Sequence, residues 1–97
     1  ENIYGFNKTY PSLYLYYIFK NLSENYNIQL NYQVIQEQKG ELTFLIEQII
    51  STSEENKLIS EIEKYFKKDI NYEIKKNTAF SIEEKNKLKN FISKINE

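Results

Sequence analysis

The alternation of apolar and polar residues predicts three β-strands. Apolar residues recur at every second position over residues 28–37, 41–49 and 70–75, which is the period of a strand with one buried face. In the first run, Ile28, Leu30, Tyr32 and Val34 share one side. A short turn with Gly40 separates the first two runs, so we expect them to form an antiparallel hairpin.

Apolar residues spaced three or four apart predict helices in three other segments. Residues 13–22 follow Pro11, which suits the first helical position, and are apolar nearly all round, so we expect more than one covered face. A capping box at Thr52-x-x-Glu55 precedes the clearest helical stripe, formed by Leu58, Ile59, Ile62, Tyr65 and Phe66. A second capping box, Ser81-x-x-Glu84, precedes a C-terminal stripe of Leu88, Phe91, Ile92 and Ile95.

The order of these elements predicts one α+β domain spanning residues 1–97. With a short edge strand within residues 3–10, the order is strand, helix, strand, strand, helix, strand, helix. This order is typical of a ferredoxin-like split β-α-β fold (β-α-β-β-α-β) with an added C-terminal helix. The length suits a single modest hydrophobic core.

Composition and charge exclude several classes of function. The chain has thirteen lysines, thirteen glutamates and one aspartate, for a net charge of −1. We therefore expect neither nucleic-acid binding nor attraction to anionic membranes. Without Cys, His or Arg, the chain has no disulfide, no zinc site, no Ser-His nucleophile and no bidentate phosphate clamp. No apolar run approaches a membrane span, and we expect a cytoplasmic protein. The absence of Met suggests a processed product or an excised piece of a larger protein.

Three groups of residues are candidates for binding. Tyr32, Phe44 and Tyr72 would stack on RNA bases if exposed, but they lie on the apolar strand faces, so we expect them in the core. The tyrosine-rich first helix is either ordinary packing or an interaction surface. The lysines of residues 85–89 are either a solvated face or a point charge for a phosphate or carboxylate.

Several segments resemble the small C-terminal domain of adenylate-forming enzymes. The similarity is to the phenylacetate–CoA ligase family and its coenzyme F390 synthetase-like and capsular polysaccharide biosynthesis relatives. It rests on segments that follow the family's order along essentially the whole chain: Ile3-Tyr4-Gly5-Phe6-Asn7, Tyr10-Pro11-Ser12, Tyr17-Ile18-Phe19-Lys20-Asn21, Tyr32-Gln33-Val34-Ile35-Gln36-Glu37, Asn86-Lys87-Leu88-Lys89 and Phe91-Ile92-Ser93-Lys94-Ile95.

This resemblance implies a lid domain in an enzyme that activates a carboxylic acid with ATP and Mg²⁺ and passes the acyl group to a thiol, usually coenzyme A. The partner would be the N-terminal adenylation domain of the same polypeptide, against which the lid rotates. The family's closing lysine falls on Lys87, where it would neutralise charge as the acid attacks the α-phosphate. The isolated domain is not expected to be catalytic.

The chain departs from the family pattern in spacing and in residue type. One extra residue lies between Asn7 and Tyr10, and three positions carry other residues than the family's. Asn86 stands where the family has glycine, and Ile82 and Glu83 stand in place of an arginine and a threonine. Asn tolerates unusual backbone angles better than most residues, so the turn before Lys87 can survive. The alternative function is a stand-alone ferredoxin-like interaction or regulatory module that self-associates weakly through the tyrosine-rich helix.

Overall fold

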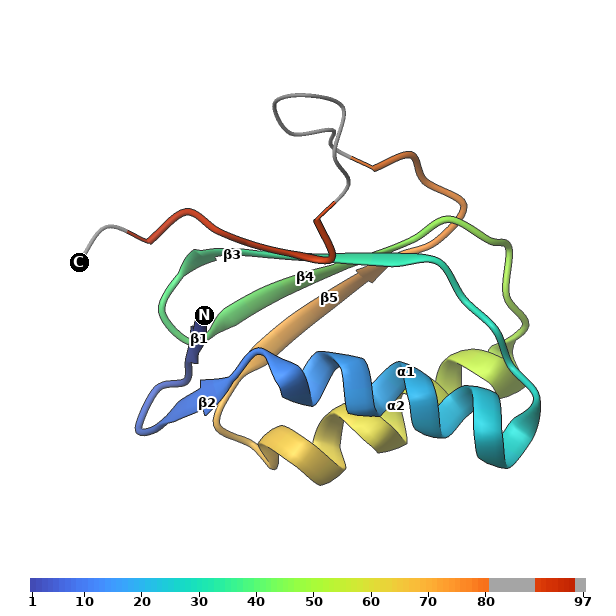
Figure 1. Cartoon of the computed structure of the whole chain (residues 1–97), viewed down its shortest axis with the longest axis horizontal. Helices are drawn as coiled ribbons and strands as arrows, with labels where there is room; N and C mark the ends of the chain where they lie inside the picture. Colours follow the sequence, from blue (N-terminus) through green and yellow to red (C-terminus); the bar gives the residue numbers. More distant parts are fainter. Residues whose placement is uncertain (81–88, 96–97) are drawn as a thin grey trace.

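The chain forms two helices and six short strands in a computed structural model (Figure 1), which describes residues 1–80 and 89–95. The helices pack side by side beneath a four-stranded sheet, and a two-stranded sheet lies at one end. The elements are β1 (Asn2–Tyr4), β2 (Thr9–Pro11), α1 (Leu13–Tyr26), β3 (Tyr32–Gln38), β4 (Glu41–Ile46), α2 (Thr52–Phe66), β5 (Asn71–Lys75) and β6 (Phe91–Ser93).

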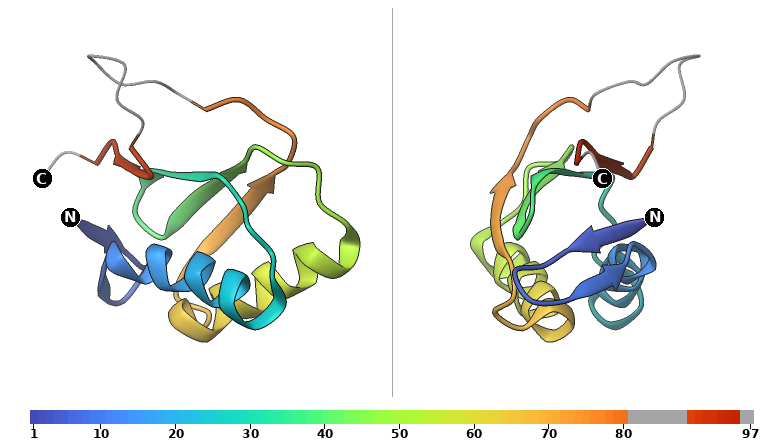
Figure 2. Two further views of the ribbon diagram at one scale, coloured as in Figure 1. Left: turned by 45° about the vertical axis from the view of Figure 1, so that its right-hand side comes forward. Right: turned by 90° about the vertical axis from the view of Figure 1, so that its left-hand side faces the viewer.

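The main sheet has the order β5-β4-β3-β6. The predicted hairpin is confirmed, because β3 and β4 pair antiparallel with Val34 opposite Phe44. Strand β5 runs parallel to β4 after the α2 crossover, and β6 runs parallel to β3. Figure 2 shows both helices on the same side of this sheet.

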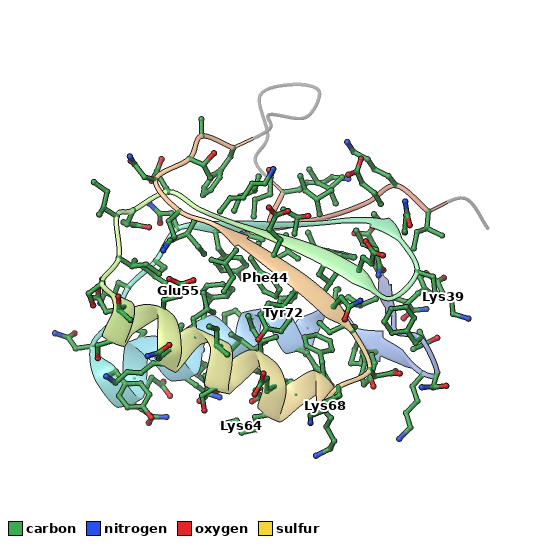
Figure 3. The ribbon with its side chains drawn as sticks, turned by 180° about the vertical axis from the view of Figure 1, so that it is seen from behind. Lys39, Phe44, Glu55, Lys64, Lys68 and Tyr72 are labelled. Atoms are coloured by element: carbon green, nitrogen blue, oxygen red, sulfur yellow. The ribbon has the colours of Figure 1, made fainter. Side chains whose placement is uncertain are left out.

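The hydrophobic core lies between the two helices and one face of the main sheet. Phe44 is fully buried there and is seen between β4 and the helices in Figure 3. Tyr32 and Tyr72 pack against the same core, as their alternating positions predicted. The helices contribute Leu15, Ile18, Leu22, Leu58, Ile62 and Phe66, each at most 2% exposed.

The strand order departs from the ferredoxin-like expectation, which is not confirmed. In a split β-α-β unit another strand separates the two strands that a helix joins. Here β4 and β5, which α2 joins, are direct neighbours, and β1 lies outside the main sheet because it pairs with β2. The coarser prediction of one α+β arrangement holds.

The predicted C-terminal helix is wrong over Phe91–Ser93, which form strand β6. Phe91 and Ile92 are each only 8% exposed, and neighbouring residues can both be buried when they point to opposite faces of a strand. The spacing of three to four residues therefore gave a wrong prediction, because two adjacent apolar residues fit the period of a helix as well as that of a strand. Leu88 and the expected Ser81–Glu84 capping box lie outside the described residues.

Two predicted helix starts are also corrected. Pro11 ends β2, and Ser12 takes the N-cap position of α1, so Pro11 is not the first helical residue. The capping box of α2 is Ser51 with Glu54, one residue before the predicted pair: the Glu54 backbone N–H donates to Ser51 Oγ, and the Ser51 N–H donates to Glu54 Oε1. The start of α1 shifts by two residues and the cap of α2 by one, which is the ordinary error of reading boundaries from sequence.

Candidate functional site

The carboxylate of Asp69, in the α2–β5 connection, collects four hydrogen bonds from the β1–β2 hairpin. Its Oδ1 accepts from the Asn7 backbone N–H at 2.9 Å and from Asn7 Nδ2 at 2.8 Å. Its Oδ2 accepts from the Lys8 backbone N–H at 3.0 Å and from the Tyr10 hydroxyl at 2.9 Å. This cluster, which we call the Asp69 knot, ties the start of the chain to the sheet.

Gly5 makes the Asp69 knot possible. A Cβ at this position would collide with Asp69 Oδ2 and come within 2.9 Å of the Lys8 carbonyl oxygen. The Gly5 N–H donates to that same carbonyl at 2.7 Å, which closes the turn. Gly5, Asn7 and Tyr10, all part of the family-like opening segment, therefore have a structural role in holding one carboxylate.

The Asp69 knot shifts the pKa values of its two acidic groups, Asp69 and Tyr10, in opposite directions. Partial burial raises the pKa of Asp69, but the hydrogen bonds from Tyr10, Asn7 and Lys8 outweigh it, so the pKa falls below the ordinary value of 3.8. For Tyr10, burial and then the hydrogen bond to Asp69 raise the pKa above its ordinary value. The carboxylate and the neutral phenol are the forms that the knot stabilises.

We expect Asp69→Asn to make the free energy of unfolding less dependent on pH in the acidic range. Because the folded-state pKa is below the unfolded value, Asp69 stabilises the fold above about pH 4 and loses this effect as the pH falls through its folded pKa. The difference in unfolding free energy between wild type and Asp69→Asn should therefore shrink as the pH drops below 4, in urea unfolding followed by circular dichroism. Glu24→Gln, an exposed carboxylate on α1, is the matched control. A pH-independent difference would contradict the assignment.

A second polar contact joins the hairpin to the main sheet. Gln36 of β3 is fully buried, and its Oε1 accepts from the Tyr4 N–H at 2.8 Å while its Nε2 donates to the Tyr4 carbonyl at 2.9 Å. The side-chain amide thus pairs with a β1 backbone unit as a neighbouring strand would. The Gly40 N–H donates to the same Tyr4 carbonyl at 2.7 Å. Gln36 lies within the family-like Tyr32–Glu37 segment.

The described chain resumes at Lys89, beside a shallow groove of about 540 Å³ between α1 and β6. We call it the α1–β6 groove; it is lined by Glu1, Ser12, Leu13, Leu15, Tyr16, Tyr32, Lys89, Asn90 and Phe91. On its floor, the Tyr32 ring stacks on Phe19 with centroids 3.8 Å apart and planes 5° apart. Burial raises the pKa of the Tyr32 hydroxyl above its ordinary value.

Three hydrogen bonds hold the rim of this groove to β3. The Lys89 carbonyl accepts from Gln33 Nε2 at 2.9 Å, Asn90 Nδ2 donates to the Tyr32 carbonyl at 2.8 Å, and the Val34 N–H donates to the Asn90 carbonyl at 2.7 Å. The backbone of residues 89–90 is therefore fixed against the central strand, while both side chains are exposed. This anchors the chain directly after the segment that contains Lys87.

Lys87, the one catalytic residue expected from the sequence, lies outside the described residues, as do Ile82, Glu83 and Asn86. Sequence reasoning missed Asp69 and Gln36, which organise the described part. Asp69 is the single aspartate in the chain, and Gln36 interrupts the apolar face of a strand. Both features indicate a polar residue with a structural role, although neither identifies its hydrogen-bond partner.

The first two turns of α1 carry three exposed apolar side chains. Leu13 and Tyr16 are each 52% exposed and Tyr17 is 37% exposed. The prediction that more than one face of this helix is covered is nevertheless confirmed. One side, with Leu15, Phe19 and Leu22, meets the core, and a second side, with Tyr14, Ile18 and Asn21, meets the core and α2. Tyr17 stacks on Tyr65 of α2, with centroids 6.3 Å apart.

Between the helices, Asn21 Nδ2 donates to Glu61 Oε1 and to the Tyr65 hydroxyl, each at 3.0 Å, and Lys64 pairs with Glu61. Glu61 is 6% exposed, so this network holds its charge at the α1–α2 contact. Over residues 1–80 and 89–95, no group of three acidic side chains could hold a metal ion, and every buried side-chain nitrogen and oxygen has a hydrogen-bond partner. None of the helices described there is both long and apolar enough to cross a membrane.

The fold and these contacts define a small α+β domain with a polar knot at one end and an aromatic groove beside its first helix. No family model, no curated protein and no solved structure matches the chain.

Proposed function

We propose that this chain is the small lid domain of an adenylate-forming acid–thiol ligase. The observation that carries the proposal is the convergence of the family-like segments. The opening segment, Tyr32–Glu37 and Phe91–Ile95 are far apart in the sequence, yet the Gln36–Tyr4 pair joins the first two and the β3–β6 pairing joins the last two. Segments that share a structural purpose are expected to contact one another in this way.

The position of Lys89 supports the role proposed for Lys87. Lys89 follows Lys87 by two residues and lies on the rim of the α1–β6 groove, with its backbone tied to Gln33. A lysine that acts on a phosphate needs a firmly anchored base, because misplacing a charge costs most of its electrostatic effect. In the proposal, β6 provides that anchor on the central sheet.

The remaining active-site parts belong to the proposed N-terminal adenylation domain, which would bind ATP with Mg²⁺, the carboxylic acid and coenzyme A. The lid would rotate against that domain between adenylation and thiol transfer. The exposed Leu13, Tyr16 and Tyr17 on α1 offer an apolar surface for such a contact. The same surface supports the second candidate function, an interaction module that self-associates through α1.

The test compares two forms of the protein in ATP–pyrophosphate exchange with a panel of carboxylic acids. We expect no exchange by the 97-residue chain alone and acid-dependent exchange by the full open reading frame that encodes it. The upstream frame should encode a Ser/Thr/Gly-rich phosphate loop and a nucleotide-binding domain. Exchange by the isolated chain, or a start codon directly before Glu1, would overturn the proposal.

A further inference from the structure

Strand β5 forms an open edge of the main sheet. It pairs with β4 on one side, and within residues 1–80 and 89–95 no strand pairs with its other side. Figure 2 shows β5 as the outermost strand, and Figure 3 shows it in front of β4 with Tyr72 on it. An open edge is a template for another strand, because its outward N–H and C=O groups point at solvent.

The pairing with β4 determines which backbone groups point outward. The Asn71 N–H donates to the Gly40 carbonyl at 2.7 Å, so Asn71 turns its backbone groups toward β4. Because this direction alternates along a strand, Glu73 and Lys75 also bond toward β4, whereas Tyr72 and Ile74 direct their N–H and C=O groups to the open side. The open edge thus offers hydrogen bonds at Tyr72 and Ile74.

We propose that a second copy of this chain pairs antiparallel with β5 across a two-fold axis at Ile74. In this register Ile74 lies opposite its own counterpart and both exchange N–H···O=C bonds, as their outward groups allow. Glu73 then lies opposite Lys75 of the other copy, and Lys75 lies opposite Glu73. Two symmetric ion pairs form on the sheet face away from the helices, where both side chains are exposed.

Charge complementarity selects both the register and the occupant. Moving the axis by one residue to Glu73 places two glutamates directly opposite each other, which is unfavourable. The strand reads Asn-Tyr-Glu-Ile-Lys and so is complementary to itself only in the Ile74-centred register. A second copy matches both charges at once through the same surface on each partner. This inference goes beyond the proposed lid function and does not depend on it.

The test measures self-association of the 97-residue chain by analytical ultracentrifugation over a wide concentration range. We expect a weak, concentration-dependent dimer. Glu73→Lys places lysines opposite each other twice, and Lys75→Glu does the same with glutamates, so each should raise the dimer Kd about tenfold. The double variant Glu73→Lys/Lys75→Glu restores both pairs with reversed polarity and should return the Kd to within about threefold of wild type.

Tyr16→Ala, on the exposed face of α1, is the variant that separates this dimer from one formed through the tyrosine-rich helix. We expect it to leave the Kd unchanged, with folding of all variants checked by circular dichroism and thermal melting. A chain that stays monomeric at every concentration would overturn the proposal. So would a dimer that Tyr16→Ala abolishes and Glu73→Lys does not, or a folded double variant that fails to regain the affinity lost in the single ones.

Discussion

In the proposed full-length ligase, Lys87→Ala should slow formation of the acyl-adenylate about 10²–10³-fold, the usual cost of removing one group that stabilises transition-state charge. Transfer of the acyl group from a preformed adenylate to coenzyme A should change little. The physical reason is that negative charge accumulates when the acid oxygen attacks the α-phosphate and is already dispersed once pyrophosphate has left. The proposed role of Lys87 is to neutralise that charge in the first half-reaction only.

Single-turnover assays of the two half-reactions measure this difference directly. Lys85→Ala is the matched control, because it removes an identical charge two residues away and should leave both rates near wild type. Lys87→Arg tests whether charge alone suffices, since a guanidinium keeps the charge but not the compact shape of an ammonium group. Equal losses in both half-reactions, or no loss in either, would remove Lys87 from the proposed site.

Gln36→Leu should lower the free energy of unfolding by about 2–4 kcal/mol, since it deletes two hydrogen bonds of a buried amide to the Tyr4 backbone. Leucine has a similar volume but cannot pair with a peptide unit. Strand β1 would then be held to the rest of the domain mainly through β2, the Asp69 knot and the Gly40–Tyr4 hydrogen bond. The β1–β2 hairpin should also exchange its amide hydrogens faster than the main sheet does.

Urea unfolding followed by tyrosine fluorescence and circular dichroism gives the stability change, and hydrogen exchange locates it. Gln38→Leu is the matched control, because it makes the same substitution in the same strand at an exposed position and should stay within about 0.5 kcal/mol of wild type. A loss below 1 kcal/mol in Gln36→Leu, or uniform protection across both sheets, would contradict the role assigned to the Gln36 amide.

The hairpin and the second helix could be predicted because each depends on local pattern. Alternation around Gly40 predicts β3 and β4, and the Leu58–Phe66 stripe predicts α2, and all three elements are present. The predicted start of the first strand at Ile28 is wrong, because β3 begins at Tyr32, and β4 ends at Ile46, before the predicted end of its run. The strand β6 could not be predicted in this way. Phe91 and Ile92 are adjacent apolar residues that fit either a helix or a strand, and pairing with the distant Val34 and Ile35 decides between them.

The site residues also fall into two groups, those whose placement the sequence predicts and those whose contacts it does not. The sequence predicts that Tyr32, Phe44 and Tyr72 lie on apolar strand faces, and the core contains or contacts all three. It gives no indication that Asp69 binds Asn7 and Tyr10, which are about sixty residues away. Such contacts depend on how the β1–β2 hairpin folds back onto the α2–β5 connection. A local hydrophobic period carries no information about contacts between residues so far apart in the sequence.

By itself, the sequence determined the α+β class, the periods of the strands and helices, and the absence of any Cys or His chemistry, since composition and short-range periodicity require no knowledge of tertiary contacts. Only the tertiary structure decided that β5 lies beside β4, that β1 leaves the main sheet, and that Gln36 and Asp69 hold the β1–β2 hairpin in place. The physical reason is that strand order and buried polar pairing are long-range choices. They depend on which backbone groups remain to be satisfied once the local elements have formed.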